Sequence, residues 1–402
     1  MPVFAPMEPT TQLELHLAAR MSRLGTETAF EVLNKARALE RQGKNIIHLE
    51  IGEPDFDTPA NVVDAGVEAL RKGWTHYGPS AGLPDLRQAI ADYAGRTRAV
   101  KVSPDEVVVV PGGKPIIFYT MLALVDQGDE VIYPNPGFPI YESMIDYAGG
   151  KAVPIQLKEE RDFCLDVREL ASLINDRTRL IILNSPQNPT GGVMTRRDVH
   201  DVAEAIGERN IIVLSDEIYS RLLFEGDHYS IMSVPGFKDR TILLDGFSKT
   251  YAMTGWRMGY GVMRSDLATH MTRLMTNSNS CTASFTQVAG IEALKGDQSS
   301  VDHMRDEFKK RRDVVVDGLN KIKGFSCRLP KGAFYVFPNI TKTGWKSKKL
   351  ADALLEEAGV ACLSGTAFGD FGEGYLRFSV ANSMENLKAA LDRVNEWTKK
   401  NL

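Results

Sequence analysis

Apolar and polar residues follow two different spacings along the chain. The three-to-four-residue spacing of an amphipathic helix fits seven stretches, at 29–42, 60–72, 84–97, 115–125, 139–147, 196–208 and 265–294. From about residue 60, short apolar runs alternate with these helices, at 107–110, 130–133, 180–183, 211–214, 241–244 and 259–262. Runs that are apolar on both faces suit strands covered by helices on both sides. The pattern predicts a three-layer α/β unit with a mostly parallel sheet.

The pattern changes after residue 295. A long charged helix is expected at 300–322, followed by strand-like runs at 333–337 and 375–380 and by helices at 348–358 and 384–400. This order is typical of a smaller α+β unit. We therefore predict a large domain at residues 50–295 and a small domain formed by residues 1–49 together with 296–402.

Composition excludes several classes of protein. The 402 residues are 43% hydrophobic and 25% charged, which is ordinary for a soluble globular protein, and the net charge of −4 does not favour nucleic acid or an anionic membrane as a partner. The four cysteines are scattered, without the spacing of a metal site, and suit a reducing compartment. No secretory signal and no apolar run of about 18 residues is evident. We expect a cytoplasmic protein without a metal.

Four of the predicted strands are followed by loops that carry reactive side chains. They read "PGGKP" (111–115), "SPQNPTGG" (185–192), "SDEIY" (215–219) and "DGFSK" (245–249). In a parallel sheet all four loops open at the same edge, where ligands of α/β proteins bind. Taken alone, Asn188 suits a turn, Asp216 a helix cap, and Lys249 an exposed surface. The combination instead favours one shared site.

Such a combination suits pyridoxal phosphate. This cofactor requires a lysine amine that holds it, a carboxylate that faces its ring nitrogen and an anion site for its phosphate. At ~4 Å and an effective dielectric near 20, a carboxylate attracts the protonated ring nitrogen by about 4 kcal/mol. Pro115 suits the first turn of a helix, whose N-terminus would bind phosphate, and Arg257 would add a planar fork of donors.

Six motifs together resemble the class I/II aminotransferases, which are pyridoxal-phosphate enzymes of the aspartate aminotransferase fold. The motifs are "SKTYAMTGWRMGY", "SPQNPTGG", "SDEIY", "GEPDFDTP", "HYGPSAGLPDLRQAI" and "YLRFSV". The resemblance extends from about residue 29 to the C-terminus. It implies a homodimeric enzyme that moves an α-amino group between an amino acid and a 2-oxo acid by a ping-pong mechanism.

The resemblance also implies roles for individual residues. Lys249 resembles the Schiff-base lysine that shuttles a proton, and Asp216 resembles the carboxylate at the ring nitrogen. Tyr219 and Asn188 resemble the pair at the cofactor's 3-oxygen, and Phe138 the aromatic residue stacked on its ring. The phosphate site would consist of Gly113, Lys114, Ser248 and Arg257, together with Tyr77 from the neighbouring subunit.

Arg377 resembles the arginine that binds the substrate α-carboxylate, with Asn188 and a backbone contact at Gly52. The sequence departs from many relatives at Gly246, where serine is common, and at Lys114, where serine or threonine is common. The side-chain pocket is expected near residues 26–30, Tyr77 and residues 275–285. No basic residue is identified there for a second carboxylate, so neutral or aromatic donors are expected to be at least as good as aspartate.

Three other functions were compared with this one. A lyase that eliminates at Cβ of its substrate would use the same scaffold, and the motifs do not distinguish it from an aminotransferase. A cofactor-sensing transcription regulator would need a DNA-binding domain, for which there is no room before residue 29. A nicotinamide dehydrogenase is disfavoured because no GxGxxG motif opens a strand–helix unit.

Overall fold

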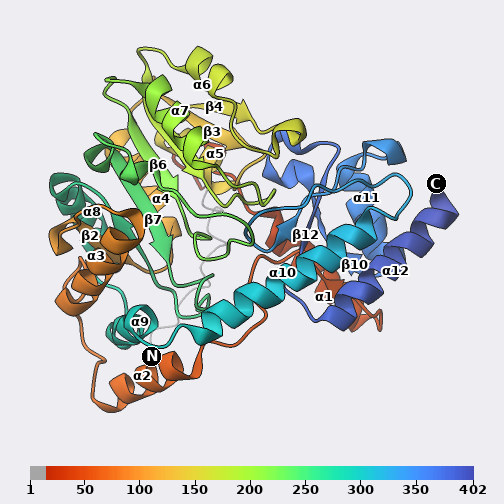
Figure 1. Cartoon of the computed structure of the whole chain (residues 1–402), viewed down its shortest axis with the longest axis horizontal. Helices are drawn as coiled ribbons and strands as arrows, with labels where there is room; N and C mark the ends of the chain where they lie inside the picture. The colour runs from red at the N-terminus through yellow and green to blue at the C-terminus, as the bar shows by residue number, and fades with distance from the viewer. Residues whose placement is uncertain (1–14) are drawn as a thin grey trace, which may run out of the picture.

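The computed structural model describes residues 15–402 of the chain (Figure 1). Its centre is a seven-stranded sheet with the strand order β2-β8-β7-β6-β5-β3-β4. The strands are β2 (Val107–Val110), β3 (Glu130–Asn135), β4 (Lys151–Gln156), β5 (Thr178–Asn184), β6 (Ile212–Asp216), β7 (Thr241–Gly246) and β8 (Gly259–Val262). Strand β8 runs antiparallel to both of its neighbours, β2 and β7, and the other six strands share one direction. The predicted mostly parallel α/β sheet is confirmed.

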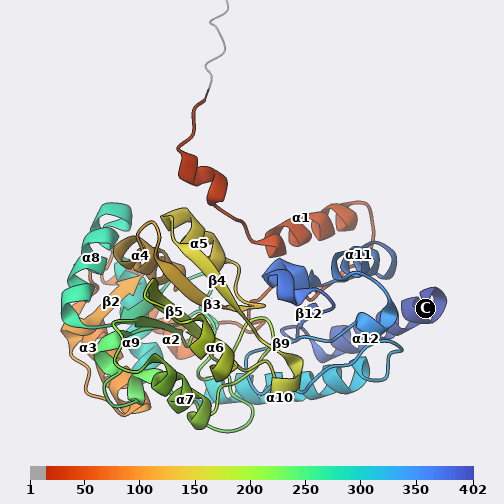
Figure 2. The same cartoon turned by 90° about the horizontal axis from the view of Figure 1, so that it is seen from above.

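Helices cover both faces of this sheet because its strands are apolar on both sides. Val108, Val131 and Leu214 pack on one face, beneath α4 (Lys114–Leu124), α5 (Ile140–Ala148) and α8 (Ser265–Asn279). Val109, Ile181 and Val213 face the other side. That side is covered by α3 (Pro84–Arg98), α6 (Val167–Leu173), α7 (Arg196–Ile206) and α9 (Ser284–Lys295), and α2 (Ala60–Arg71) packs on α9. Figure 2 shows these two helical layers above and below the strands.

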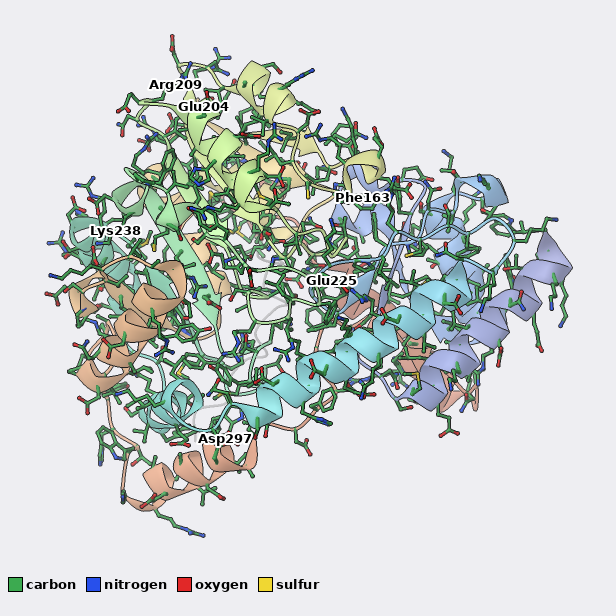
Figure 3. All side chains as sticks on the ribbon, in the orientation of Figure 1. Phe163, Glu204, Arg209, Glu225, Lys238 and Asp297 are labelled. Atoms are coloured by element: carbon green, nitrogen blue, oxygen red, sulfur yellow. The ribbon has the colours of Figure 1, made fainter. Side chains whose placement is uncertain are left out.

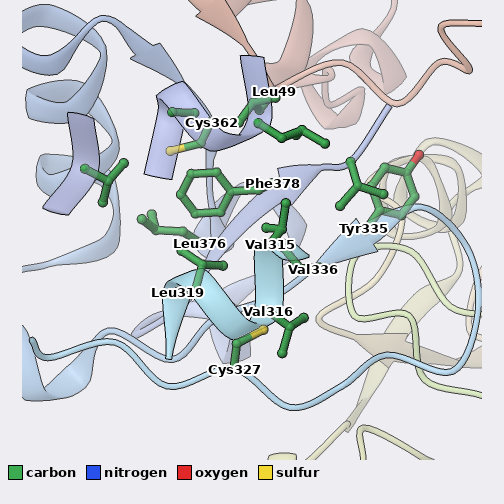
Figure 4. Packing of buried hydrophobic residues seen from close by; sticks show 14 of the residues in the cluster. Leu49, Val315, Val316, Leu319, Cys327, Tyr335, Val336, Cys362, Leu376 and Phe378 are labelled. Atoms are coloured by element: carbon green, nitrogen blue, oxygen red, sulfur yellow. The ribbon is translucent and has the colours of Figure 1, made fainter. Parts of the chain in front are cut away.

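The second region of the chain has a core of its own. It contains two small sheets, one of β1 (Ile47–His48) with β10 (Val360–Ala361), and one of β11 (Leu363–Ser364), β12 (Leu376–Ser379) and β9 (Tyr335–Val336). Its helices are α1 (Thr28–Arg41), α10 (Ser299–Leu319), α11 (Ser347–Ala353) and α12 (Met384–Asn401). Val315 and Leu319 of α10 pack against Val336, Leu376 and Phe378 of the small sheet (Figure 4).

The two regions also share packing. Leu222 and Phe224, in the loop after β6, belong to the core of the second region. The carboxylate of Glu225, labelled in Figure 3, accepts two hydrogen bonds from Arg312 of α10, at 2.7 and 2.9 Å. The long helix α10 leads from the large sheet to the second region (Figure 1). The domain limits at residues 49/50 and 295/296 stay a prediction, and residues 1–14 of the predicted small domain lie outside the described residues.

Some elements differ from the sequence-based expectation. The single helix expected at 265–294 is wrong: α8 ends at Asn279, and Ser280 adopts a left-handed φ of 64° before α9 begins at Ser284. The preceding Asn and Ser residues hydrogen-bond readily to nearby backbone and therefore weaken a helix. Strand β4 was missed because it contains Pro154 and polar ends, which an edge strand tolerates.

Candidate active site

A cavity of about 460 Å³ opens at the carboxyl edge of the large sheet. Strands β2, β5, β6 and β7 are parallel, so the four loops named from the sequence meet there. Eleven of the twelve predicted site residues line the cavity, namely Gly52, Gly113, Lys114, Phe138, Asn188, Asp216, Tyr219, Ser248, Lys249, Arg257 and Arg377. Tyr77 does not line it and is 90% exposed.

Asp216 ends strand β6 and is buried beneath the cavity. Its carboxylate accepts a hydrogen bond from the Tyr141 hydroxyl at 2.6 Å and another from the backbone N–H of Ile218 at 3.2 Å. Burial nevertheless raises the pKa of Asp216 to about 6. A buried carboxylate without a cationic partner is costly, so this position fits a ligand that presents a positive N–H group.

Lys249 lies in the turn after β7, and its ammonium faces the same cavity. Its Nζ donates to the carbonyl oxygen of Gly52 and lies 5.7 Å from the centre of the Phe334 ring. Burial lowers the pKa of Lys249 to about 8. At pH 7.5 roughly a quarter of such amines are neutral, against roughly 0.1% for an ordinary lysine. A neutral amine can attack a carbonyl carbon.

One wall of the cavity is built to receive an anion. Helix α4 begins at Lys114, and no side chain caps its N-terminus. Gly112 has a φ of +88°, and a Cβ at this position would collide with the Arg257 guanidinium. A Cβ at Gly259 would meet the backbone nitrogen of Gly113 at 2.8 Å. The glycines thus bring Arg257 close to the free N–H groups of a helix start, an arrangement that binds phosphate well.

Arg377, on β12, also lines the cavity and is buried. Its Nη1 donates to the side-chain oxygen of Asn188 at 3.1 Å, and its Nη2 donates to the carbonyl oxygen of Glu50. The guanidinium lies 4.4 Å from the Tyr335 ring centre and 4.8 Å from that of Phe368. Its Nε is buried without a partner in the described part of the chain. A planar guanidinium held in this way suits a carboxylate ligand.

Comparison with known proteins identifies the family. The family model "Aminotransferase class I and II" matches residues 44–394. This chain belongs to the class I and II aminotransferase family. It is 40% identical over 383 residues to an aspartate aminotransferase of Pyrococcus horikoshii, which covers 94% of this chain and 96% of the relative. It is 37% identical to aromatic-amino-acid aminotransferase 2 of Thermococcus litoralis, over 95% of this chain and 98% of the relative.

Solved structures agree with this assignment. The alanine aminotransferase from Pyrococcus furiosus superposes with a TM-score of 0.91 at 33% identity, covering 96% of this chain and all of that one. The chain is therefore an aminotransferase. Its relatives are named for aspartate, aromatic amino acids or alanine, so the family fixes the reaction class and leaves the substrate open.

The sequence of the aminotransferase did not reveal several residues of the cavity. Tyr141, which binds Asp216, lies three residues after Phe138 in "PNPGFPIY", and this spacing was the one available signal. The Tyr335 hydroxyl shares a hydrogen bond of 2.8 Å with that of Tyr219, from a distant part of the chain. Glu27 pairs with Lys114, and both residues line the cavity. Of the expected side-chain pocket, Glu27, Ala29 and Phe30 line the cavity, whereas Thr26, Thr28, Tyr77 and residues 275–285 do not.

A buried ionic cluster lies behind the aminotransferase site. Arg98, in the last turn of α3, has its Nη2 at 2.7 Å from Asp245 and 3.0 Å from Glu217. The Glu217 carboxylate also contacts His228 at 2.7 Å and accepts hydrogen bonds from two serine hydroxyls. Although burial opposes it, His228 and Arg98 lower the pKa of Glu217 to about 2. Glu217 follows Asp216 directly, and Asp245 precedes Lys249 by four residues. The cluster therefore ties the end of β6, which carries Asp216, to the end of β7, which leads to Lys249.

In the described range, 15–402, no helix is both long and apolar enough to span a bilayer.

Proposed function

We propose that this aminotransferase binds pyridoxal phosphate in the 460 Å³ cavity and moves an α-amino group between an amino acid and a 2-oxo acid by a ping-pong mechanism. One observation carries the proposal. A buried carboxylate, a partly buried amine of lowered pKa and an uncapped helix start beside an arginine all line this cavity. When bound, the cofactor supplies an aldehyde that carries the amino group and a ring that accepts electrons from the substrate Cα–H bond.

The residues present fit this group. Asp216, held by Tyr141, would keep the ring nitrogen protonated. The helix start at Gly113, with Ser248 and Arg257, would hold the phosphate. Phe138 would lie on the face of the ring.

Lys249 is the residue proposed to hold the cofactor and to move a proton from the substrate Cα. Its Nζ shares the cavity with Asp216, and its lowered pKa leaves a useful fraction of the amine neutral near pH 8. Tyr219 and Asn188 line the same space and are proposed to donate hydrogen bonds to the cofactor's 3-oxygen. Tyr335 orients the Tyr219 hydroxyl through their shared hydrogen bond.

Arg377 is proposed to bind the substrate α-carboxylate, with Asn188 and the backbone of Gly52 beside it. Amino donor and 2-oxo acid acceptor share this carboxylate, so both can use the same site in turn. A ping-pong mechanism requires this alternation.

Tyr77 is proposed to act across a dimer interface. It does not line the cavity of its own chain, and its side chain is 90% exposed. Sedimentation should give twice the mass of the chain. A mixture of Tyr77→Phe and Lys249→Ala chains tests the role, because the Lys249→Ala chain would supply an intact Tyr77 to the other chain's site. Activity of the mixture above that of either variant alone supports it, and no gain on mixing contradicts it.

A panel of amino acids, given to the cofactor-loaded enzyme without an acceptor, tests the reaction. The expected result is one equivalent of 2-oxo acid per site, with loss of the cofactor's aldehyde absorbance. Continuous release of ammonia without an acceptor would instead identify the β-eliminating lyase. Failure of every amino acid to react with the loaded enzyme would refute both.

A further inference from the structure

Four cationic residues line the cavity, and three of them already have proposed ligands. These three are Lys249, Arg257 and Arg377. The fourth, Lys114, was assigned to the phosphate site from the sequence, but its ammonium is paired with the carboxylate of Glu27. The same ammonium lies 5.6 Å from the centre of the Phe138 ring. The cavity therefore contains a cation that could bind a second substrate carboxylate, and this cation is already paired with Glu27.

Glu27 and Lys114 come from different parts of the fold. It directly precedes α1, whereas Lys114 begins α4, and the two residues are 87 positions apart. The side chain of Glu27 is 23% exposed and that of Lys114 is 45% exposed, so both are partly shielded from water. Of the other carboxylates that line the cavity, Glu53 accepts a hydrogen bond from Thr254 and Asp216 one from Tyr141. Glu27 is thus the carboxylate that neutralises Lys114.

We propose that Glu27 neutralises Lys114, the cation that the side-chain carboxylate of an acidic substrate would need as its partner. On the proposed function, on which this inference rests, the enzyme then prefers amino acids with neutral aliphatic or aromatic side chains. An acidic side chain must displace Glu27 or lie beside it, and either arrangement leaves a carboxylate poorly paired. A neutral side chain leaves the Glu27–Lys114 pair intact and can contact Ala29, Phe30 and Ile51, which line the same cavity.

The test compares wild type with Glu27→Gln, which removes the charge and keeps the size. The half-reactions of aspartate and phenylalanine with the cofactor-loaded enzyme give two values of kcat/KM. The aspartate-to-phenylalanine ratio is expected to rise about tenfold in Glu27→Gln, through a gain for aspartate alone. Calorimetry provides a readout without turnover. The Kd for maleate, a dicarboxylate, should fall by a similar factor, and that for 3-phenylpropionate should not change.

Two further variants make the result specific. Glu31→Gln, an exposed change one turn further along α1, should leave the ratio unchanged. Adding Lys114→Gln to Glu27→Gln should remove the gain, because the freed cation would be gone. A rise of at least about threefold that Lys114→Gln removes supports the inference. A smaller change, an equal gain for phenylalanine or a gain that survives Lys114→Gln overturns it. Wild type that reacts with no amino acid would instead refute the proposed function.

Discussion

Replacing Arg98 with alanine tests whether the buried cluster behind the site supports the fold. In the wild type, Arg98 Nη2 lies 2.7 Å from Asp245 and 3.0 Å from Glu217, and all three side chains are nearly inaccessible to water. At about 3 Å and an effective dielectric near 20, each contact is worth roughly 5 kcal/mol before the cost of burial is subtracted. Breaking a buried ion pair on one side typically costs about 3–5 kcal/mol of folding free energy.

Removal of Arg98 would affect the carboxylates of Glu217 and Asp245 unequally. Glu217 keeps His228 and two serine hydroxyls, whereas Asp245 keeps mainly the backbone N–H of Gly246 at 2.7 Å. We therefore expect a loss near ~3 kcal/mol, the lower end of the range, which arises mostly at Asp245. Against a typical total stability of about 5–15 kcal/mol, such a loss is large.

The loss should also depend on pH, with a definite sign. Burial already raises the pKa of Asp245, and removal of Arg98 would raise it further above its unfolded value of about 3.9. A carboxyl group whose folded pKa is raised destabilises the fold once it ionises, and proton uptake relieves this. The loss in free energy of unfolding of Arg98→Ala, relative to wild type, should be larger at pH 8 than at pH 5.5.

Urea denaturation of the cofactor-loaded variants measures this deficit. Arg96→Ala, an exposed change on the same helix, is the matched control and should stay within about 0.5 kcal/mol of wild type. Asp245→Asn added to Arg98→Ala should recover part of the loss and flatten its pH dependence. A loss below about 1 kcal/mol, or one equal at both pH values, would refute the reasoning.

Four other results are expected. Borohydride reduction of the loaded enzyme and peptide mapping should find the pyridoxyl group on Lys249; a label on Lys114 would contradict this. Asp216→Asn should keep the fold but slow the half-reaction by about 10²–10³, or ~3–4 kcal/mol, and near-normal kcat would make Asp216 structural. Arg377→Lys should lower kcat/KM for all amino acid substrates by a similar factor; a loss for acidic substrates only would mean that Arg377 binds the side-chain carboxylate instead. Reconstitution of the apoenzyme with pyridoxal phosphate should accelerate with pH around 8, because Lys249 then becomes neutral, and a flat stopped-flow profile would refute this.

The parts of the site that sequence could predict are those fixed by local order along the chain. Reactive loops that follow parallel strands must meet at one sheet edge, so the positions of Asp216 and Lys249 follow from the pattern alone. Contacts between distant segments leave no such pattern. Glu27 and Lys114 are 87 residues apart, and Arg98 and Asp245 are 147 apart. Arg98 in particular occupies the last turn of a helix, where a basic residue is ordinarily explained by the helix dipole.

The charged residues of the scaffold and those of the site differ in whether they form ion pairs. Arg98, Glu217 and Asp245 are buried, and each has an ionic partner, with Arg98 shared between the two carboxylates and His228 also beside Glu217. Pairing of this kind is how a protein tolerates charge in its interior.

The groups around the cavity are different. Asp216, Lys249, Arg257 and Arg377 form no ion pair among the described residues, although all four line one cavity and three of them are buried or nearly so. Several unpaired charged side chains in one cavity destabilise a fold unless a ligand supplies their partners. A cofactor with a phosphate and a protonated ring, together with a substrate carboxylate, would supply the missing partners. Among the residues that the structure describes, Lys114 is the one cation of the cavity with a carboxylate partner from the protein, and for that reason we assign this partner, Glu27, to selectivity between substrates.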